Sequence, residues 1–180
     1  MQKIIINIVG DFAVGKDTLA DILIKKMLEQ KIDTGKILSK TTRQPRHENE
    51  NTHTFTNKLE YNDDKINNQI IAETEINKEK YWTSKNQFTH HHDIYVTDTK
   101  GTLDLQKTPY TIFTIHVKRK TPKTQRTTRH RETPLHNLTY NYTYDNNGTL
   151  EDLSNEADKI IMAIQKYEKD LQKIYNKQYS

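Results

Sequence analysis

The chain has 180 residues, of which 32% are hydrophobic and 29% charged, and its net charge is +4. This length fits one domain with a hydrophobic core. The sequence has no cysteine, which excludes disulfides, thiolate metal sites and a cysteine nucleophile and is typical of the reducing cytoplasm. The N-terminal apolar run, about six residues long, is too short for a secretory signal or a membrane span. We therefore expect a cytoplasmic protein with no membrane partner.

Strands and helices alternate in the first part of the chain. A continuous apolar run at 3–9 predicts a strand buried on both faces of a parallel sheet. Apolar residues at helical spacing predict a helix over 16–30, and a short strand follows at about 36–39. From 40 to 92 the pattern is polar and irregular, with a candidate helix at 58–68 and a short strand at 70–71. This segment is predicted to be an inserted lobe.

The alternation resumes after residue 92. Strands are predicted within 93–101 and at 110–117, with a short helix at 101–107 between them. A basic segment follows at 118–133, then a last strand and turn within 139–150 and a terminal helix over 150–175. The order predicts an α/β fold, a doubly wound parallel sheet flanked by helices, with ligands at the carboxyl ends of the strands. We expect one domain over 1–180, with its core at 1–39 and 93–180.

A phosphate-binding loop lies between the first strand and the first helix. Gly10, Gly15 and Lys16 fit the pattern G-x-x-x-x-G-K, and that context is the one the motif needs. The backbone N–H groups would face an anion and Lys16 its outer phosphates, which predicts a nucleoside triphosphate, although a tight turn with a capping aspartate is the alternative. The residues predicted to bind it are Gly10, Ala13, Val14, Gly15, Lys16, Asp17 and Thr18.

The residue after the lysine departs from the usual pattern. Serine or threonine normally stands there, and its hydroxyl helps to hold magnesium. Here Asp17 takes the position and Thr18 follows it. A carboxylate is also a hard oxygen ligand, so both residues are candidate ligands of Mg²⁺.

The stretch SKTTRQPRHENENTHTF, at 39–55, carries a pair of cations. Arg43 and Arg46 flank Pro45, and two guanidinium groups suit a small phosphate because each binds its oxygens in bidentate fashion. From these residues alone, a solvated basic turn is an equal alternative.

Three motifs in order resemble those of the guanylate kinase family. They are S-x-T-T-R-x-P-R at 39–46, KYWTSKNQF at 80–88, where the family has Y-G-T-S, and VTDTKG at 96–101, where it has D-x-Q-G. The resemblance covers nearly the whole chain and implies a kinase that uses ATP and Mg²⁺ to phosphorylate a nucleoside monophosphate. In that family 40–92 would be the acceptor-binding lobe and about 118–135 a short lid. The implied acceptor site consists of Ser39, Arg43, Arg46, His53, Tyr81, Thr83, Ser84 and Asp98.

The same resemblance implies the catalytic roles. Lys16 and Arg43 would hold the donor and acceptor phosphates, Asp98 would face the acceptor or magnesium, and Arg129 would be the lid arginine that closes over the transferring group. Arg126 and Arg131 are weaker candidates for that lid role. The lid is shorter than in the family, which implies the loss of a helix with a second lid arginine.

Departures from the family pattern leave the acceptor open. Ala72 stands where the family has its guanine-reading glutamate, and Glu73 is expected to face the other way on a strand. His53 replaces a tyrosine. His53, the GKDT loop and DNNGTL at 145–150 resemble ribose 1,5-bisphosphate phosphokinase, and GKDT also resembles some phage deoxynucleoside monophosphate kinases. GMP and dGMP are the first candidates, with a sugar phosphate, or a non-catalytic binding module, as alternatives.

Two further features of the sequence bear on possible partners. The basic segment at 118–131 makes nucleic acid a lesser candidate partner, through a kinase that acts on modified bases in DNA. His90, His91 and His92 suggest a metal, but adjacent residues on a strand point in alternating directions and no local motif completes a coordination shell. No metal is predicted there.

Overall fold

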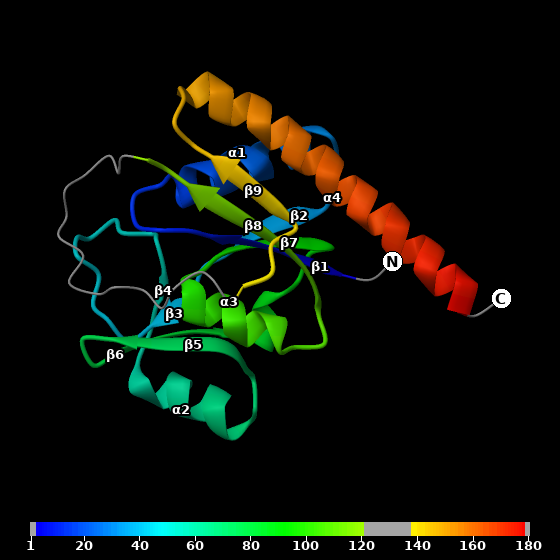
Figure 1. Ribbon diagram of the computed structural model, residues 1–180. Coiled ribbons are helices and arrows are strands. Elements are labelled where there is room, and N and C mark those ends of the chain that lie inside the picture. Colours follow the sequence, from blue (N-terminus) through cyan, green and yellow to red (C-terminus); the bar gives the residue numbers. More distant parts are fainter. Residues whose placement is uncertain (1–2, 121–137, 179–180) are drawn as a thin grey trace.

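A computed structural model describes residues 3–178 apart from 121–137 (Figure 1). Its central sheet has five strands in the order β2-β7-β1-β8-β9, and every pairing in it is parallel. The strands are β1 (Ile4–Val9), β2 (Thr34–Ile37), β7 (His92–Val96), β8 (Thr111–Lys118) and β9 (Tyr142–Asp145). The predicted doubly wound α/β fold is confirmed.

Helices cover both faces of this sheet (Figure 1). On one face α1 (Lys16–Glu29) packs beside α4 (Leu150–Gln178), and on the other lies α3 (Thr99–Gln106). Alternate residues of β1 serve the two faces, because successive side chains on a strand point in opposite directions. Ile4, Ile6 and Ile8 join the core under α1 and α4, whereas Ile5 packs with Leu105 of α3.

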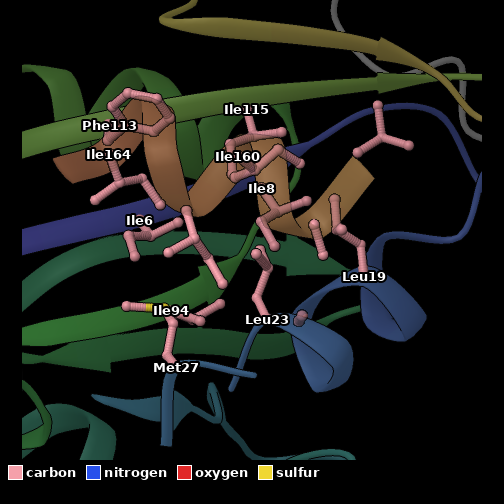
Figure 2. Packing of buried hydrophobic residues seen from close by; sticks show 14 of the residues in the cluster. Ile6, Ile8, Leu19, Leu23, Met27, Ile94, Phe113, Ile115, Ile160 and Ile164 are labelled. Atoms are coloured by element: carbon pink, nitrogen blue, oxygen red, sulfur yellow. The ribbon is translucent and has the colours of Figure 1, made fainter. Parts of the chain in front are cut away.

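Figure 2 shows the larger of these two cores from close by. Isoleucines of β1, β7 and β8 gather between the two helices of that face. The contributing residues include Ile6, Ile8, Ile94 and Ile115 of the sheet, Leu19, Leu23 and Met27 of α1, and Ile160 and Ile164 of α4.

A second, smaller sheet forms within the predicted lobe. Its order is β4-β3-β6-β5, from β3 (Lys40–Thr41), β4 (Thr54–Phe55), β5 (Ile70–Ile76) and β6 (Glu79–Ser84). The helix α2 (Lys58–Ile66) packs on it, and a short 3₁₀ turn, η1 (Lys85–Gln87), follows β6. The strand predicted at 70–71 is longer than expected because it pairs along its length with β6, a strand that was not predicted.

Several element boundaries differ from the prediction by one to a few residues, and two of these differences have a clear structural reason. The helix α3 begins at Thr99 because Asp98 caps it, accepting a hydrogen bond from the Gly101 N–H at 2.6 Å. The strand β2 spans Thr34–Ile37, where it pairs with β7 in register. Among the helices that the structure describes, none has both the length and the hydropathy needed to cross a bilayer.

Candidate active site

The loop between β1 and α1 has the geometry of an anion site. Gly10 has φ +156°, and a Cβ there would lie 2.1 Å from the Val117 carbonyl oxygen of β8. Gly15 has φ +99° in the left-handed region, and a Cβ there would lie 2.5 Å from Asn146 Nδ2. Gly15 is also the N-cap of α1 and brings no side chain to accept from the first-turn N–H groups. Those donors are therefore available to a phosphate.

Lys16 bends back over this loop. Its Nζ donates to the carbonyl oxygens of Gly10 at 2.6 Å and Asp11 at 2.8 Å. It lines a donor cavity of about 380 Å³ together with Ala13, Val14, Gly15, Asp17 and Thr18. The other walls come from residues that the site prediction missed, chiefly Arg119, Asn146 and Thr149.

Asn146 joins the last strand to the phosphate loop. It is 4% exposed, and its Nδ2 donates to the Val14 carbonyl oxygen at 2.8 Å. The sequence offered one signal for it, the DNNGTL stretch at 145–150, but no local rule gives this asparagine a partner 132 residues earlier.

The predicted magnesium ligands lie on the wall of the donor cavity. The Asp17 side chain is 77% exposed, and its Oδ1 lies 3.8 Å from Lys36 Nζ, which is itself bound to Asp21 at 2.8 Å. Thr18 is exposed beside it. Exposed carboxylate and hydroxyl oxygens next to a phosphate loop fit the ligand chemistry of Mg²⁺.

A second cavity, the acceptor cavity, of about 540 Å³, lies between the small sheet and the carboxyl end of β7. It gathers six of the eight residues predicted for the acceptor: Ser39, Arg43, Arg46, His53, Tyr81 and Asp98. The other two, Thr83 and Ser84, are fully buried and do not line it. Thr83 donates through Oγ1 to the hydroxyl of Tyr95, which lies 2.9 Å from Ser39 Oγ and does line the cavity.

The two arginines of the acceptor cavity share the partner Glu50 but bind it at different distances, since Arg46 Nη1 lies 4.0 Å from Glu50 Oε1. Arg43 donates from both terminal nitrogens to Glu50, at 3.1 and 2.8 Å, and lies over the ring of Phe55. The Glu50 side chain is 3% exposed and also accepts from the Arg46 backbone N–H. The hydrogen bonds from Arg43, and then that from Arg46, hold the pKa of Glu50 well below its usual value. The Arg46 side chain, in contrast, is 70% exposed.

His53 and Tyr81 pack edge to face in the acceptor cavity, with ring centroids 5.4 Å apart. Burial, followed by the charge of Arg43, lowers the pKa of His53. The carboxylate of Asp17 acts on this pKa in the opposite direction. The acceptor cavity thus lies within electrostatic reach of the phosphate loop.

The carboxylates of Glu73 and Asp98, on the same cavity wall as Ala72, already accept hydrogen bonds from other residues. Ala72 is 3% exposed on the cavity wall, where it has no polar side chain to offer a base. The Glu73 carboxylate accepts from Tyr61 at 2.7 Å and lies 3.6 Å from Lys65, so it faces α2. Asp98 caps α3 through Gly101.

The predicted lid arginine, Arg129, lies outside the described residues, as do Arg126 and Arg131. Most of the predicted lid, about 118–135, falls in the same range. The part of the chain that the structure describes therefore leaves the lid a prediction.

Comparison with known proteins gives information about the fold. No family model matches the sequence, and no curated protein matches it either. Among the solved structures that match is a guanylate kinase from Anaplasma phagocytophilum, with 17% sequence identity and a TM-score of 0.61. The match covers 91% of this chain and 87% of that one. At this identity the likeness concerns architecture, and the chain has a guanylate kinase-like fold.

Proposed function

We propose that this protein is an ATP-dependent phosphotransferase that phosphorylates a nucleoside or deoxynucleoside monophosphate. The observation that carries the proposal is the presence of two cavities, each lined by cationic side chains, at one edge of the sheet. The donor cavity is built on the loop after β1, and the acceptor cavity is lined by Arg46 and by Asp98, which follows β7. Carboxyl ends of parallel strands are where such folds bind ligands.

The donor would be held by the first-turn N–H groups of α1 and by Lys16. The ammonium of Lys16 already lies over the loop, so little rearrangement is needed to reach the outer phosphates. Asp17 and Thr18 are the residues that would hold Mg²⁺, which when bound neutralises charge on the β- and γ-phosphates.

The acceptor would present its phosphate to Arg46, with Tyr81 and Arg43 beside it. An oxygen of that phosphate attacks the γ-phosphorus of ATP, the bond from this phosphorus to the bridging oxygen breaks, and ADP leaves. No covalent enzyme intermediate is required. Lys16 and the arginines act by neutralising charge on the phosphoryl oxygens, and positioning supplies most of the rest.

The acceptor cavity also bears on the choice of base. A carboxylate is a strong acceptor for the ring N–H and amino groups of guanine, and the two carboxylates on the described cavity wall, Glu73 and Asp98, already have partners. The hydroxyls of Ser39 and Tyr95 are the neutral polar groups nearby. Pyrimidine nucleotides therefore belong in the same test as GMP and dGMP.

An acceptor panel tests the proposal. Purified protein with ATP and Mg²⁺ is given GMP, dGMP, dTMP, dUMP or ribose 1,5-bisphosphate, and ADP release is followed. We expect acceptor-dependent ADP release with at least one nucleotide, lost by about 10²-fold or more in Lys16→Ala. Lys25→Ala, an exposed lysine on the same helix, is the matched control.

Two outcomes would replace the proposal. Turnover with ribose 1,5-bisphosphate alone would make the protein a sugar-phosphate kinase. ATP binding without acceptor-dependent ADP release would make it a binding module that has kept the scaffold.

A further inference from the structure

Two histidines and a glutamate meet at the edge of the sheet opposite the candidate active site. His92 is the first residue of β7, and His91 precedes it, whereas the phosphate loop and Asp98 follow the carboxyl ends of their strands. Glu168 lies on α4, 76 residues beyond His92. The proposed phosphotransfer uses none of these three residues.

Their ligand atoms are already close together. Nε2 of His91 and Nε2 of His92 lie 3.1 and 3.0 Å from the same oxygen, Glu168 Oε1. One ligand atom from each residue lies within 4.8 Å of the others, and no other such group of three was found in the described part of the chain. Zinc bonds of about 2.0–2.2 Å at tetrahedral angles put neighbouring ligand atoms about 3.3 Å apart. The two N–O distances, from His91 and His92 to Glu168, are near that value.

The surroundings of His92 suit a metal ion on its Nε2. Its Nε2 faces Glu168, and its Nδ1 faces the Asp33 carbonyl oxygen at 3.4 Å. A neutral imidazole has one N–H, so it can donate to one of these two acceptors but not to both. A metal ion on Nε2 lets Nδ1–H donate to Asp33, the arrangement usual for metal-bound histidine.

Burial and access also suit an ion. His92 is 5% exposed, and its place is fixed by the pairing of β7 with β1 and β2. The side chains of His91 and Glu168 are about one-fifth exposed, which leaves an entry path and room for a water. Two imidazoles and one carboxylate, with no thiolate, suit zinc better than the all-oxygen sites of Mg²⁺ or Ca²⁺.

We propose that His91, His92 and Glu168 bind one Zn²⁺ ion, with water in the fourth position. The ion would tie the start of β7 to α4, away from the phosphate cavities. The sequence argument against a metal rested on the alternation of side chains along a strand. That argument does not cover this cluster, because His91 stands just before β7 and the third group comes from a distant helix.

Zinc titration of the full-length, metal-free protein without nucleotide tests the site. We expect calorimetry and competition with a chromophoric chelator to give one equivalent per chain, and thermal unfolding to shift upward as the zinc concentration rises. Co²⁺ in place of zinc should give the visible absorption of a tetrahedral site. Absence of saturable uptake by folded protein would overturn the proposal.

Matched variants locate the bound ion. His91→Gln and Glu168→Gln should each weaken zinc affinity by about 10-fold or more, because each removes or weakens a ligand. His90→Gln is the control, since the His90 ring turns instead to Asp93 at 3.1 Å, and it should leave the affinity unchanged. Circular dichroism checks the fold of each variant. Binding that is the same in Glu168→Gln as in the unmodified chain would place the ion elsewhere and leave a hydrogen-bonded cluster alone.

Discussion

Arg46 and Arg43 have the same chemistry and both lie near Glu50, but only Arg43 binds its carboxylate through two hydrogen bonds. The Arg46 side chain is 70% exposed in the acceptor cavity, whereas the Arg43 side chain is hydrogen-bonded to the buried carboxylate of Glu50. A guanidinium without a bidentate protein partner is the better one to meet an incoming phosphate. Arg43 instead fixes the loop that presents Arg46, whose backbone N–H also donates to Glu50.

The variant Arg46→Ala should therefore act on acceptor binding and spare the fold. A hydrogen bond to a charged group contributes about 1.5–3 kcal/mol, so we expect the acceptor KM to rise about 10- to 100-fold while the melting temperature stays unchanged. Steady-state kinetics and thermal unfolding measure the two quantities.

Arg43→Ala provides the contrast. It leaves Glu50 buried without its main partner, so it should lower the melting temperature as well as activity. If instead Arg46→Ala lowered the melting temperature and Arg43→Ala did not, the roles assigned to the two arginines would be exchanged.

Among the elements, α2 is joined to the small sheet by a buried polar network. Asp64 on α2 accepts from Lys40 Nζ of β3 at 2.9 Å and from Trp82 Nε1 of β6 at 2.8 Å. Both charged side chains are about one-tenth exposed. Glu60, on the same helix, also lies 2.7 Å from Lys40.

Asp64→Ala should destabilise this part of the fold. Breaking a buried pair costs about 3–5 kcal/mol, and we expect the lower end of that range because Glu60 still balances Lys40. Urea unfolding measures the free energy, with Asp63→Ala as control, since Asp63 is exposed and its carboxylate accepts a hydrogen bond from the nearby Asn67. Equal losses in the two variants would contradict the role of the network.

The helix α4 completes the core on the other side of the molecule. Ile160 is fully buried in it, while Met162, two residues on, is 68% exposed. We expect Ile160→Ala to lower the free energy of unfolding by about 2–5 kcal/mol, the usual cost of such a truncation. Met162→Ala should stay within about 0.5 kcal/mol. Similar values for both in chemical denaturation would mean that α4 does not pack as the structure shows.

These elements also show what local sequence determines. Three neighbouring elements could be predicted: the strand at 3–9, the loop after it and the helix from residue 16. Their signals are an apolar run, the spacing of the glycines and the helical spacing of apolar residues, and all three lie within about 30 residues. The strand β6 could not be predicted in this way, because Tyr81, Trp82 and Thr83 form a strand by pairing with β5. In the same way Glu50, Asn146 and Glu168 were missed as site residues, since each gains its role from a contact that the chain makes only when folded.

At the scale of the whole molecule, ionisable groups link the fold to pH. Neighbouring cations and hydrogen-bond donors lower the pKa of several carboxylates. The largest cause at Glu50 is the hydrogen bond from Arg43, and the largest cause at Glu60 is the hydrogen bond from Lys40. A group with a lowered folded pKa stabilises the protein above its unfolded pKa and loses that contribution as pH falls. Burial lowers the pKa of His53 and His116 as well, so their contribution begins to be lost below about pH 6.5.

The alkaline side has the opposite sign. Burial, together with the hydrogen bond to Glu156, raises the pKa of Tyr142 to about 12. Its unfolded form ionises near pH 10, so folding stability should fall as pH rises from about 10 toward 12. Raised pKa values of Lys40 and Lys80, each paired with carboxylates, add to this loss.

We therefore expect the urea midpoint to be highest between about pH 7 and 9. The midpoint should decline slightly below about pH 6.5, because the two histidines take up protons more readily in the unfolded chain than in the folded one. It should decline steeply below about pH 4.5, because the carboxylates that are paired in the folded chain protonate more readily in the unfolded chain. Glu50→Gln should make the fall of the urea midpoint at acid pH less steep, because that variant lacks a carboxylate whose pKa is strongly lowered by folding. Glu151→Gln, at an exposed position, should leave the fall unchanged. A urea midpoint that stays constant from about pH 8 to about pH 3 would show that these pairs do not stabilise the folded chain, and it would contradict the view that Glu50 holds Arg43 in place.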